Sequence, residues 1–294
     1  MKRPLLTVTI LMIAAAFALN VQADTEKAKE HFNAAVTSAQ AGDIDGAVVA
    51  YKAAITTDEN YIDAYINLGV IYFEQKDYEN ALSTFKTASE KDATSLDAFK
   101  NLGSVQYKLK KYADAEASFA AAKGIDASNA DVLKQLGKSQ AQLKKWKEAI
   151  ATLEACHTAG GGDYYTWFLL GKAQDKTGEK TAAISSYKKC VQEKPKYYNG
   201  HYALGQLYLA SEKYKSAASS FQAASNAKPA KFRAFYNYAI AVESSNPENY
   251  GKNIGVWQEF VAKYKNNTQA NTLVGQAREH IKELEKAKTA ASLQ

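Results

Sequence analysis

The sequence is poor in the residue types that most often carry chemistry. It has only two cysteines and four histidines in 294 residues, and the histidines are widely separated along the chain. No HExxH motif, CxxC pair or nucleophile elbow occurs, so the usual metal, redox and acyl-transfer signatures are missing. These absences predict a protein with no catalytic residues, no metal site and no cofactor, and an enzyme is the least favoured class.

Blocks of like charge are also missing. Lysine and arginine number 37 against 31 acidic residues, which gives a net charge of +6. The basic residues are spread along the chain rather than clustered. A modest, dispersed positive charge argues against nucleic acid as the partner.

Long apolar runs are absent after the first 23 residues. Lys2 and Arg3 precede an apolar stretch at 5–19, and the chain then reads Val21-Gln22-Ala23. A basic start, a short apolar middle and an A-x-A-like exit predict a cleaved secretory signal peptide over 1–23. An uncleaved anchor helix is the alternative, but about 15 apolar residues fall short of the ~20 that span a bilayer. There is no cysteine near the predicted cleavage site that could carry a lipid anchor. We therefore expect a periplasmic or secreted protein, with bacteria as the favoured source.

The pair Leu-Gly recurs every 34 residues in the rest of the chain. The five copies are Leu68-Gly69, Leu102-Gly103, Leu136-Gly137, Leu170-Gly171 and Leu204-Gly205. A large residue stands three positions before each leucine. A fixed period of this length indicates a tandem array of one small supersecondary unit.

A second set of positions follows the same period. Six alanines from Ala47 to Ala217 are each followed, four residues later, by a bulky apolar residue and, three further on, by a small one. The bulky residues are Tyr51, Phe85, Phe119, Leu153, Tyr187 and Phe221. Spacings of three and four residues predict two amphipathic helices in each unit. Such a small helix pair cannot bury its own apolar face, so neighbouring units must stack.

This pattern resembles the tetratricopeptide repeat (TPR) family, and Pro195 and Pro229 end their units at the family's place. The resemblance implies an all-α protein, a right-handed α-solenoid of about seven TPR helix pairs plus a C-terminal capping helix. We expect one TPR solenoid over 24–288, with regular units at 28–231, an atypical unit at 232–265 and the capping helix at 268–288. Residues 289–294 are expected to form a frayed tail.

Their positions in the 34-residue repeat indicate that the cysteines, two of the histidines and the consecutive glycines have structural roles. Cys156 and Cys190 are equivalent residues of successive units, and packed helix axes lie about 8–10 Å apart, which is too far for a disulfide. His31 and His201 take the large, core-facing position. The glycines at 160–162 are interpreted as a helix C-cap, with Asp163 capping the next helix, because a phosphate cradle needs a strand before it.

In TPR proteins the first helix of each pair lines the concave face. A row that lies opposite the core there includes Asn67 and Asn101 and continues to Gln135. Asparagine offers both a donor and an acceptor to an extended peptide backbone. The alternative remains open that asparagine before Leu-Gly is common in the family whatever is bound.

Lysines and tyrosines share this predicted face. Lys100, Lys134, Lys138, Lys172 and Lys176 would attract an acidic segment, although they could equally be solvated lysines without a role. Tyr202 and Tyr236 would supply contact area on the C-terminal side. The predicted partner-binding residues are therefore Asn67, Asn101, Lys100, Lys134, Lys138, Lys172, Tyr202 and Tyr236.

The sequence thus predicts a non-catalytic scaffold for protein–protein interaction. It would bind a partner protein or an acidic peptide segment in a concave groove, in the bacterial envelope. The alternative is a glycan-binding helper in polysaccharide export or cell-wall handling, since groove tyrosines can also stack on sugars.

Overall fold

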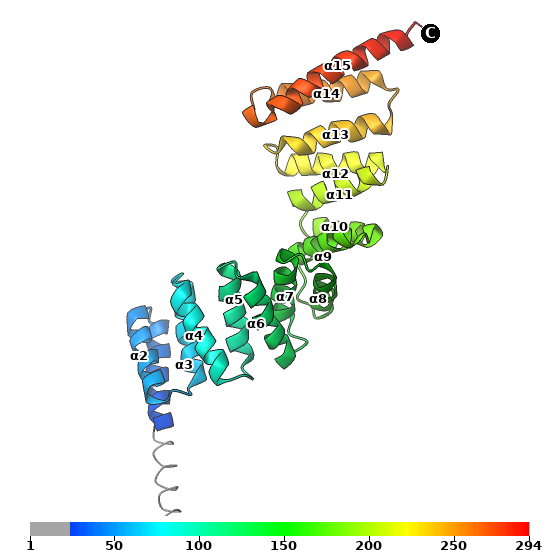
Figure 1. Cartoon of the computed structure of the whole chain (residues 1–294). Helices are drawn as coiled ribbons and strands as arrows, with labels where there is room; N and C mark the ends of the chain where they lie inside the picture. Colours follow the sequence, from blue (N-terminus) through cyan, green and yellow to red (C-terminus); the bar gives the residue numbers. More distant parts are fainter. Residues whose placement is uncertain (1–23, 294) are drawn as a thin grey trace, which may run out of the picture. The chain divides into compact units, whose positions relative to one another are not determined.

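The computed structural model describes residues 24–293, and these residues are helical with no strand among them. The predicted signal peptide, 1–23, lies outside the described residues. The chain divides into two compact units after Leu143 (Figure 1). The first unit contains a helix over 24–40, α2 (Ile44–Thr57), α3 (Ile62–Glu74), α4 (Tyr78–Lys91), α5 (Leu96–Lys108), α6 (Tyr112–Ile125) and α7 (Ala130–Gln142).

The second unit holds the remaining helices. They are α8 (Trp146–Thr158), α9 (Tyr164–Thr177), α10 (Lys180–Glu193), α11 (Tyr198–Ala210), α12 (Tyr214–Ala227), α13 (Phe232–Ser245), α14 (Tyr250–Tyr264), the 3-10 turn η1 (Thr268–Ala270) and α15 (Asn271–Ala291). Within each unit, consecutive helices pack against one another, as α3 does with α4 and α11 with α12. The predicted class, all-α TPR helix pairs, is confirmed; the single solenoid over 24–288 stays a prediction.

In four of the five Leu-Gly pairs, the glycine makes room for an aromatic ring on the second helix of the same helix pair. A Cβ on Gly69 would lie 2.6 Å from the Phe85 ring, and one on Gly103 would lie 2.8 Å from Phe119. Glycine therefore allows the ring to pack directly on the backbone of the first helix. The bulky positions predicted from the sequence are buried throughout: Tyr51, Phe85, Phe119, Leu153, Tyr187 and Phe221 are each at most 3% exposed.

The turn between the two helices of a pair needs one residue in the left-handed region, and this residue also recurs every 34 positions. Glycine fills it at Gly42 and Gly178, with φ of 81° and 88°. Four other turns place a side chain there with φ between 55° and 63°: Lys76, Lys110, Lys144 and Glu212. The left-handed residue lets the chain reverse within a few residues, at a conformational cost where it is not glycine.

The glycine-rich loop between α8 and α9 is a pair of helix caps, as predicted. Gly160 is left-handed, with φ of 79°, directly after α8. The Asp163 side chain accepts hydrogen bonds from the backbone N–H groups of Tyr165 and Thr166 at 3.0 and 2.9 Å, which caps α9.

The C-terminal end departs from the regular repeat in the predicted way. By the 34-residue period the second helix would start at residue 248, but α14 begins at Tyr250. Trp257, Phe260 and Tyr264 of this shifted helix are buried with Val274 and further residues of α15. The capping helix differs from its predicted bounds of 268–288: η1 precedes it and α15 continues to Ala291. Alanines and long side chains with good helix propensity carry the helix into the expected tail.

The two cysteines occupy the small packing positions. Cys156 and Cys190 are fully buried thiols, equivalent to Ala88 and Ala122 in the first unit. Burial raises the pKa of the Cys190 thiol to about 12, which keeps it protonated and unreactive. No helix in residues 24–293 is both long and apolar enough to cross a membrane.

Candidate functional site

Three successive first helices of the first unit, α3, α5 and α7, form a groove of about 450 Å³, which we call the first groove. Its lining includes Phe73, Asn101, Ser104, Tyr107, Gln135 and Lys138. Equivalent repeat positions contribute equivalent parts of the wall. The position before Leu-Gly supplies Asn101 and Gln135, and the position after it supplies Ser104 and Lys138. The 34-residue period therefore builds a surface that itself repeats.

Lys138 is held over the aromatic floor of the first groove. Its Nζ donates to Gln135 Oε1 at 2.9 Å and lies 5.2 Å from the centre of the Tyr107 ring. Lys108 lines the same groove, and Glu74 is the single carboxylate in its lining. The side chains that face this groove thus carry a net positive charge over an apolar floor.

Three of the five predicted residues that belong to the first unit are not among those that line the first groove. Asn67 turns back on its own helix, because its Nδ2 donates to the Asp63 carbonyl at 2.8 Å. Lys100 donates to Asp97 Oδ1 at 2.6 Å, one helical turn earlier. Lys134 is half-buried and also lies outside the lining. Their assignment to the binding surface stays a prediction.

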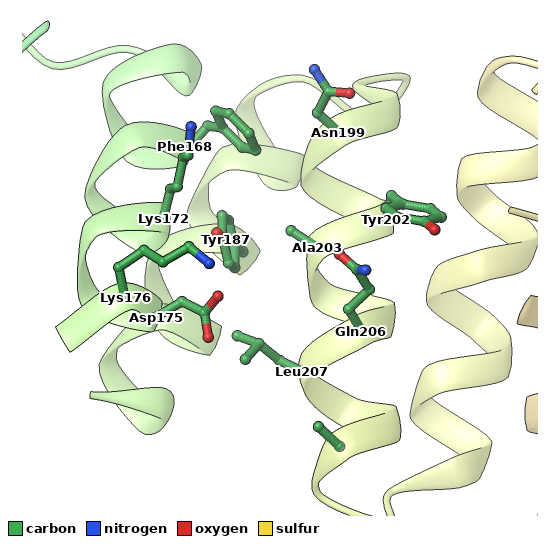
Figure 2. Close-up of a pocket in the computed structure, with 11 residues that line it drawn as sticks. Phe168, Lys172, Asp175, Lys176, Tyr187, Asn199, Tyr202, Ala203, Gln206 and Leu207 are labelled. Carbon is green, nitrogen blue, oxygen red and sulfur yellow. The ribbon is translucent and has the colours of Figure 1, made fainter. Parts of the chain in front are cut away.

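A second groove of about 480 Å³ lies in the second unit, between α9 and α11 (Figure 2). Its lining includes Phe168, Lys172, Asp175, Lys176, Tyr202 and Gln206. Figure 2 shows Lys176 and Asp175 reaching from α9 toward Gln206 and Leu207 of α11. Two lysines face one carboxylate here, so the second groove, like the first, carries a net positive charge.

Lys172 and Tyr202 have neighbours that fix their place in the second groove. The Lys172 Nζ lies 5.7 Å from the centre of the Trp146 ring. The Tyr202 ring stacks on Tyr198 with centroids 5.5 Å apart, and its hydroxyl accepts a hydrogen bond from Asn237 Nδ2 at 3.1 Å. Tyr202 is therefore partly a packing residue that joins α11 to α13.

The third groove, about 400 Å³, is at the end of the second unit, and we call it the terminal groove. Its lining includes Tyr236, Ile240, Glu243, Trp257, Ala277 and His280. Tyr236 is half-buried and makes edge contacts with the Trp257 and Phe260 rings at 5.1 and 5.4 Å. Burial raises the pKa of its hydroxyl.

The two histidines that the sequence assigned to core-facing positions are half-buried. His201 Nε2 lies 2.8 Å from the Pro195 carbonyl oxygen, which satisfies the ring at the junction between repeats. The other two histidines make contacts that the sequence did not reveal. His157 stacks on Trp167, and His280 meets Glu243, 37 residues away in sequence. The 34-residue period is unbroken at His157, and only the shifted start of α14 marked the region around His280 as irregular.

Within the described part of the chain, no group of three or more His, Cys, Asp or Glu side chains could hold a metal ion. The first and second grooves combine amides, lysines and aromatic rings. Such a lining can hydrogen-bond a peptide backbone and attract carboxylates.

Comparison with known sequences agrees with the helix pairs and their period. Models of the tetratricopeptide repeat match residues 38–105, 164–197 and 202–246. The chain belongs to the tetratricopeptide repeat family. No curated protein matches the sequence.

Several solved structures share the fold. YrrB, described as a TPR protein with an unusual peptide-binding site, is 18% identical with a TM-score of 0.56, over 66% of this chain and 97% of its own. MamA from Desulfovibrio magneticus RS-1 is 21% identical with a TM-score of 0.54, over 58% and 96%. PilF from Pseudomonas aeruginosa is 18% identical with a TM-score of 0.57, over 76% and 98%. At these identities the likeness concerns the fold alone.

Proposed function

We propose that the protein is a non-catalytic scaffold that binds an extended, acidic segment of a partner protein across the first helices of successive repeats. The observation that carries this proposal is the first groove. There Asn101 and Gln135 place side-chain amides at equivalent repeat positions, in a groove that Phe73 and Tyr107 also line. Amides can pair with a peptide backbone while the rings contact apolar side chains. The peptide-binding site of YrrB, a TPR protein that shares the fold, supports a peptide as the ligand class.

The preference for an acidic segment rests on charge. The first groove has Lys108 and Lys138 against Glu74. The second groove has Lys172 and Lys176 against Asp175. In a groove with apolar walls, an excess of one charge attracts and orients segments of opposite charge.

The proposed location is the bacterial envelope, in the periplasm or outside the cell. This part of the proposal is supported by the first 23 residues of the sequence, with Lys2 and Arg3 ahead of the apolar run at 5–19. The glycan-binding alternative has less support. It relies on the Tyr202 and Tyr236 rings, and both already pack against neighbouring aromatic rings.

The test compares two probe peptides by fluorescence anisotropy at low salt. One is a short extended peptide that alternates glutamate with leucine and phenylalanine, and the other has glutamine in place of each glutamate. We expect the wild-type protein to prefer the acidic peptide, and added salt to reduce that preference. Lys138→Gln and Lys172→Gln should each weaken binding of the acidic peptide about two- to fivefold, the size of one exposed charge interaction.

Two matched control variants have the same net charge as the groove variants Lys138→Gln and Lys172→Gln. Lys86→Gln on α4 and Lys188→Gln on α10 remove exposed lysines that line neither groove. They should leave affinity for the acidic peptide unchanged. Equal binding of both peptides by the wild type, or an equal loss in the control variants, would refute the proposed preference.

A further inference from the structure

Glu243, near the end of α13, accepts hydrogen bonds from the two helices that follow it. The Trp257 Nε1–H of α14 donates to its Oε2 at 2.7 Å. His280 Nε2 of α15 lies 2.8 Å from Oε2 and 3.0 Å from Oε1. One carboxylate therefore joins α13, α14 and α15, the last three long helices of the second unit (Figure 1).

The hydrogen bond between His280 and Glu243 is the polar contact that connects α15 to α13. The buried apolar contacts of α15 with the core around Trp257 and Phe260 are made by Val274, Ala277 and Leu284. The other ion pairs of α15, Lys282 to Glu279 at 2.9 Å and His280 to Glu283 at 3.4 Å, stay within the helix. Among the described residues, His280 to Glu243 is the one side-chain hydrogen bond that links α15 to another helix.

Both nitrogens of the His280 ring face carboxylates. Besides Glu243 at Nε2, Glu283 Oε2 of the same helix lies 3.4 Å from Nδ1. α14 contributes the Trp257 indole, whose ring meets the imidazole edge to face at 5.4 Å, and α13 also contributes Tyr236 to the lining of the same groove. A neutral imidazole carries one N–H, whereas the protonated ring donates from both nitrogens and gains charge assistance.

We propose that His280 and Glu243 form a pH-sensitive latch on the terminal helix. Protonated His280 holds α15 against α13. Loss of the proton weakens that link and loosens α15, which also forms one wall of the terminal groove. The latch is independent of what the grooves bind.

The direction of the pH effect depends on whether burial or the neighbouring glutamates have the larger effect on the pKa of His280. Burial lowers the pKa of His280, but the hydrogen bonds and charges of Glu243 and Glu283 outweigh it and raise the pKa above 6.5. A raised pKa means that the folded state binds the proton more tightly than the unfolded state. The stabilisation is therefore fully present below pH 6.5 and is lost as the pH rises through the raised pKa of the folded protein.

The experiment has two readouts on the full mature chain. NMR titration of the His280 ring should give a pKa above 6.5 in the wild type and a lower one in Glu243→Gln, which keeps an oxygen acceptor for Trp257. Hydrogen exchange measured by mass spectrometry, corrected for the intrinsic effect of pH, should show α15 opening more readily as the pH rises. Each pH unit by which the pKa of His280 is raised corresponds to about a tenfold change in the opening constant.

Three variants separate the latch from general effects. His280→Gln should abolish the pH dependence of α15 exchange, whereas Glu279→Gln, at the exposed pair on the same helix, and His201→Gln should leave it intact. The proposal is overturned if the pKa of His280 is unaffected by Glu243→Gln. It is equally overturned if α15 exchange in His280→Gln keeps the pH dependence of the wild type.

Discussion

The His157 imidazole lies stacked on the Trp167 indole, with ring centroids 3.4 Å apart and an angle of 18° between the ring planes. The Lys189 Nζ lies 4.1 Å from the centre of the same indole ring. Trp167 Nε1 donates to Glu193 Oε1 at 2.9 Å. This cluster joins α8, α9 and α10 where the loop between repeats is glycine-rich.

The stack predicts a specific sensitivity to acid. Burial, followed by the charge of Lys189, lowers the pKa of His157 from 6.5 to about 4. Because the unfolded state binds this proton more readily, the contribution of His157 to stability is present above pH 6.5 and is lost as the pH falls toward 4. His157→Gln should therefore lose less stability than the wild type over that range, as measured by thermal unfolding followed by circular dichroism.

The control for that series is His201→Gln, which removes another half-buried histidine but no stacked ring pair. If the melting temperatures of the wild type and of His157→Gln fall in parallel as the pH decreases, the prediction that His157 is neutral and stacked in the folded protein is wrong.

The glycine of the Leu-Gly pair gives a second prediction. Gly103→Ala would place a Cβ 2.8 Å from the Phe119 ring, so the ring must shift and we expect a loss of about 1–3 kcal/mol in the free energy of unfolding. Phe119→Leu in the same chain should recover part of that loss. Gly124→Ala is the control, because nothing lies within 4 Å of its added Cβ. Urea unfolding measures all three, and equal effects of both alanines would contradict the packing explanation.

The left-handed residues in the turns give a third prediction. Lys110 has φ of 61°, and Gly178 occupies the equivalent place with φ of 88°. Lys110→Gly should raise the free energy of unfolding by up to about 1 kcal/mol, because glycine adopts this conformation without the side-chain penalty. Gly178→Ala should lower it by about 1–2 kcal/mol. Changes of the same sign in the two variants would show that the turn conformation does not decide stability here.

The core could be predicted from sequence because it depends on spacing alone. Apolar residues three and four apart on a helix face the same side, so the period predicts that Phe85, Phe119 and their equivalents are buried, and they are. The same period placed Asn101 and Lys138 on one surface, and they line one groove.

Side-chain partners were less predictable, because they depend on rotamers and on the nearest available group. Asn67 and Asn101 occupy equivalent positions, yet only Asn67 donates to the carbonyl one turn back. Lys100 likewise pairs with Asp97 of its own helix. The His280 contact with Glu243 falls where the repeat is shifted, so the period could not align the two residues. The His157 stack depends on α8 ending at Thr158 before a glycine loop.

The central claim is that the first helices carry the binding surface, and site-specific photo-crosslinking tests it most directly. A photoreactive residue would replace Lys108 or Gln206, which are exposed and line the first and second grooves, with Val49 and Ile125 on second helices as controls. The glutamate-containing probe peptide should give adducts at Lys108 and Gln206, and an excess of unlabelled peptide should prevent them. Adducts of equal yield at Val49 and Ile125, or none at the groove positions, would contradict the account.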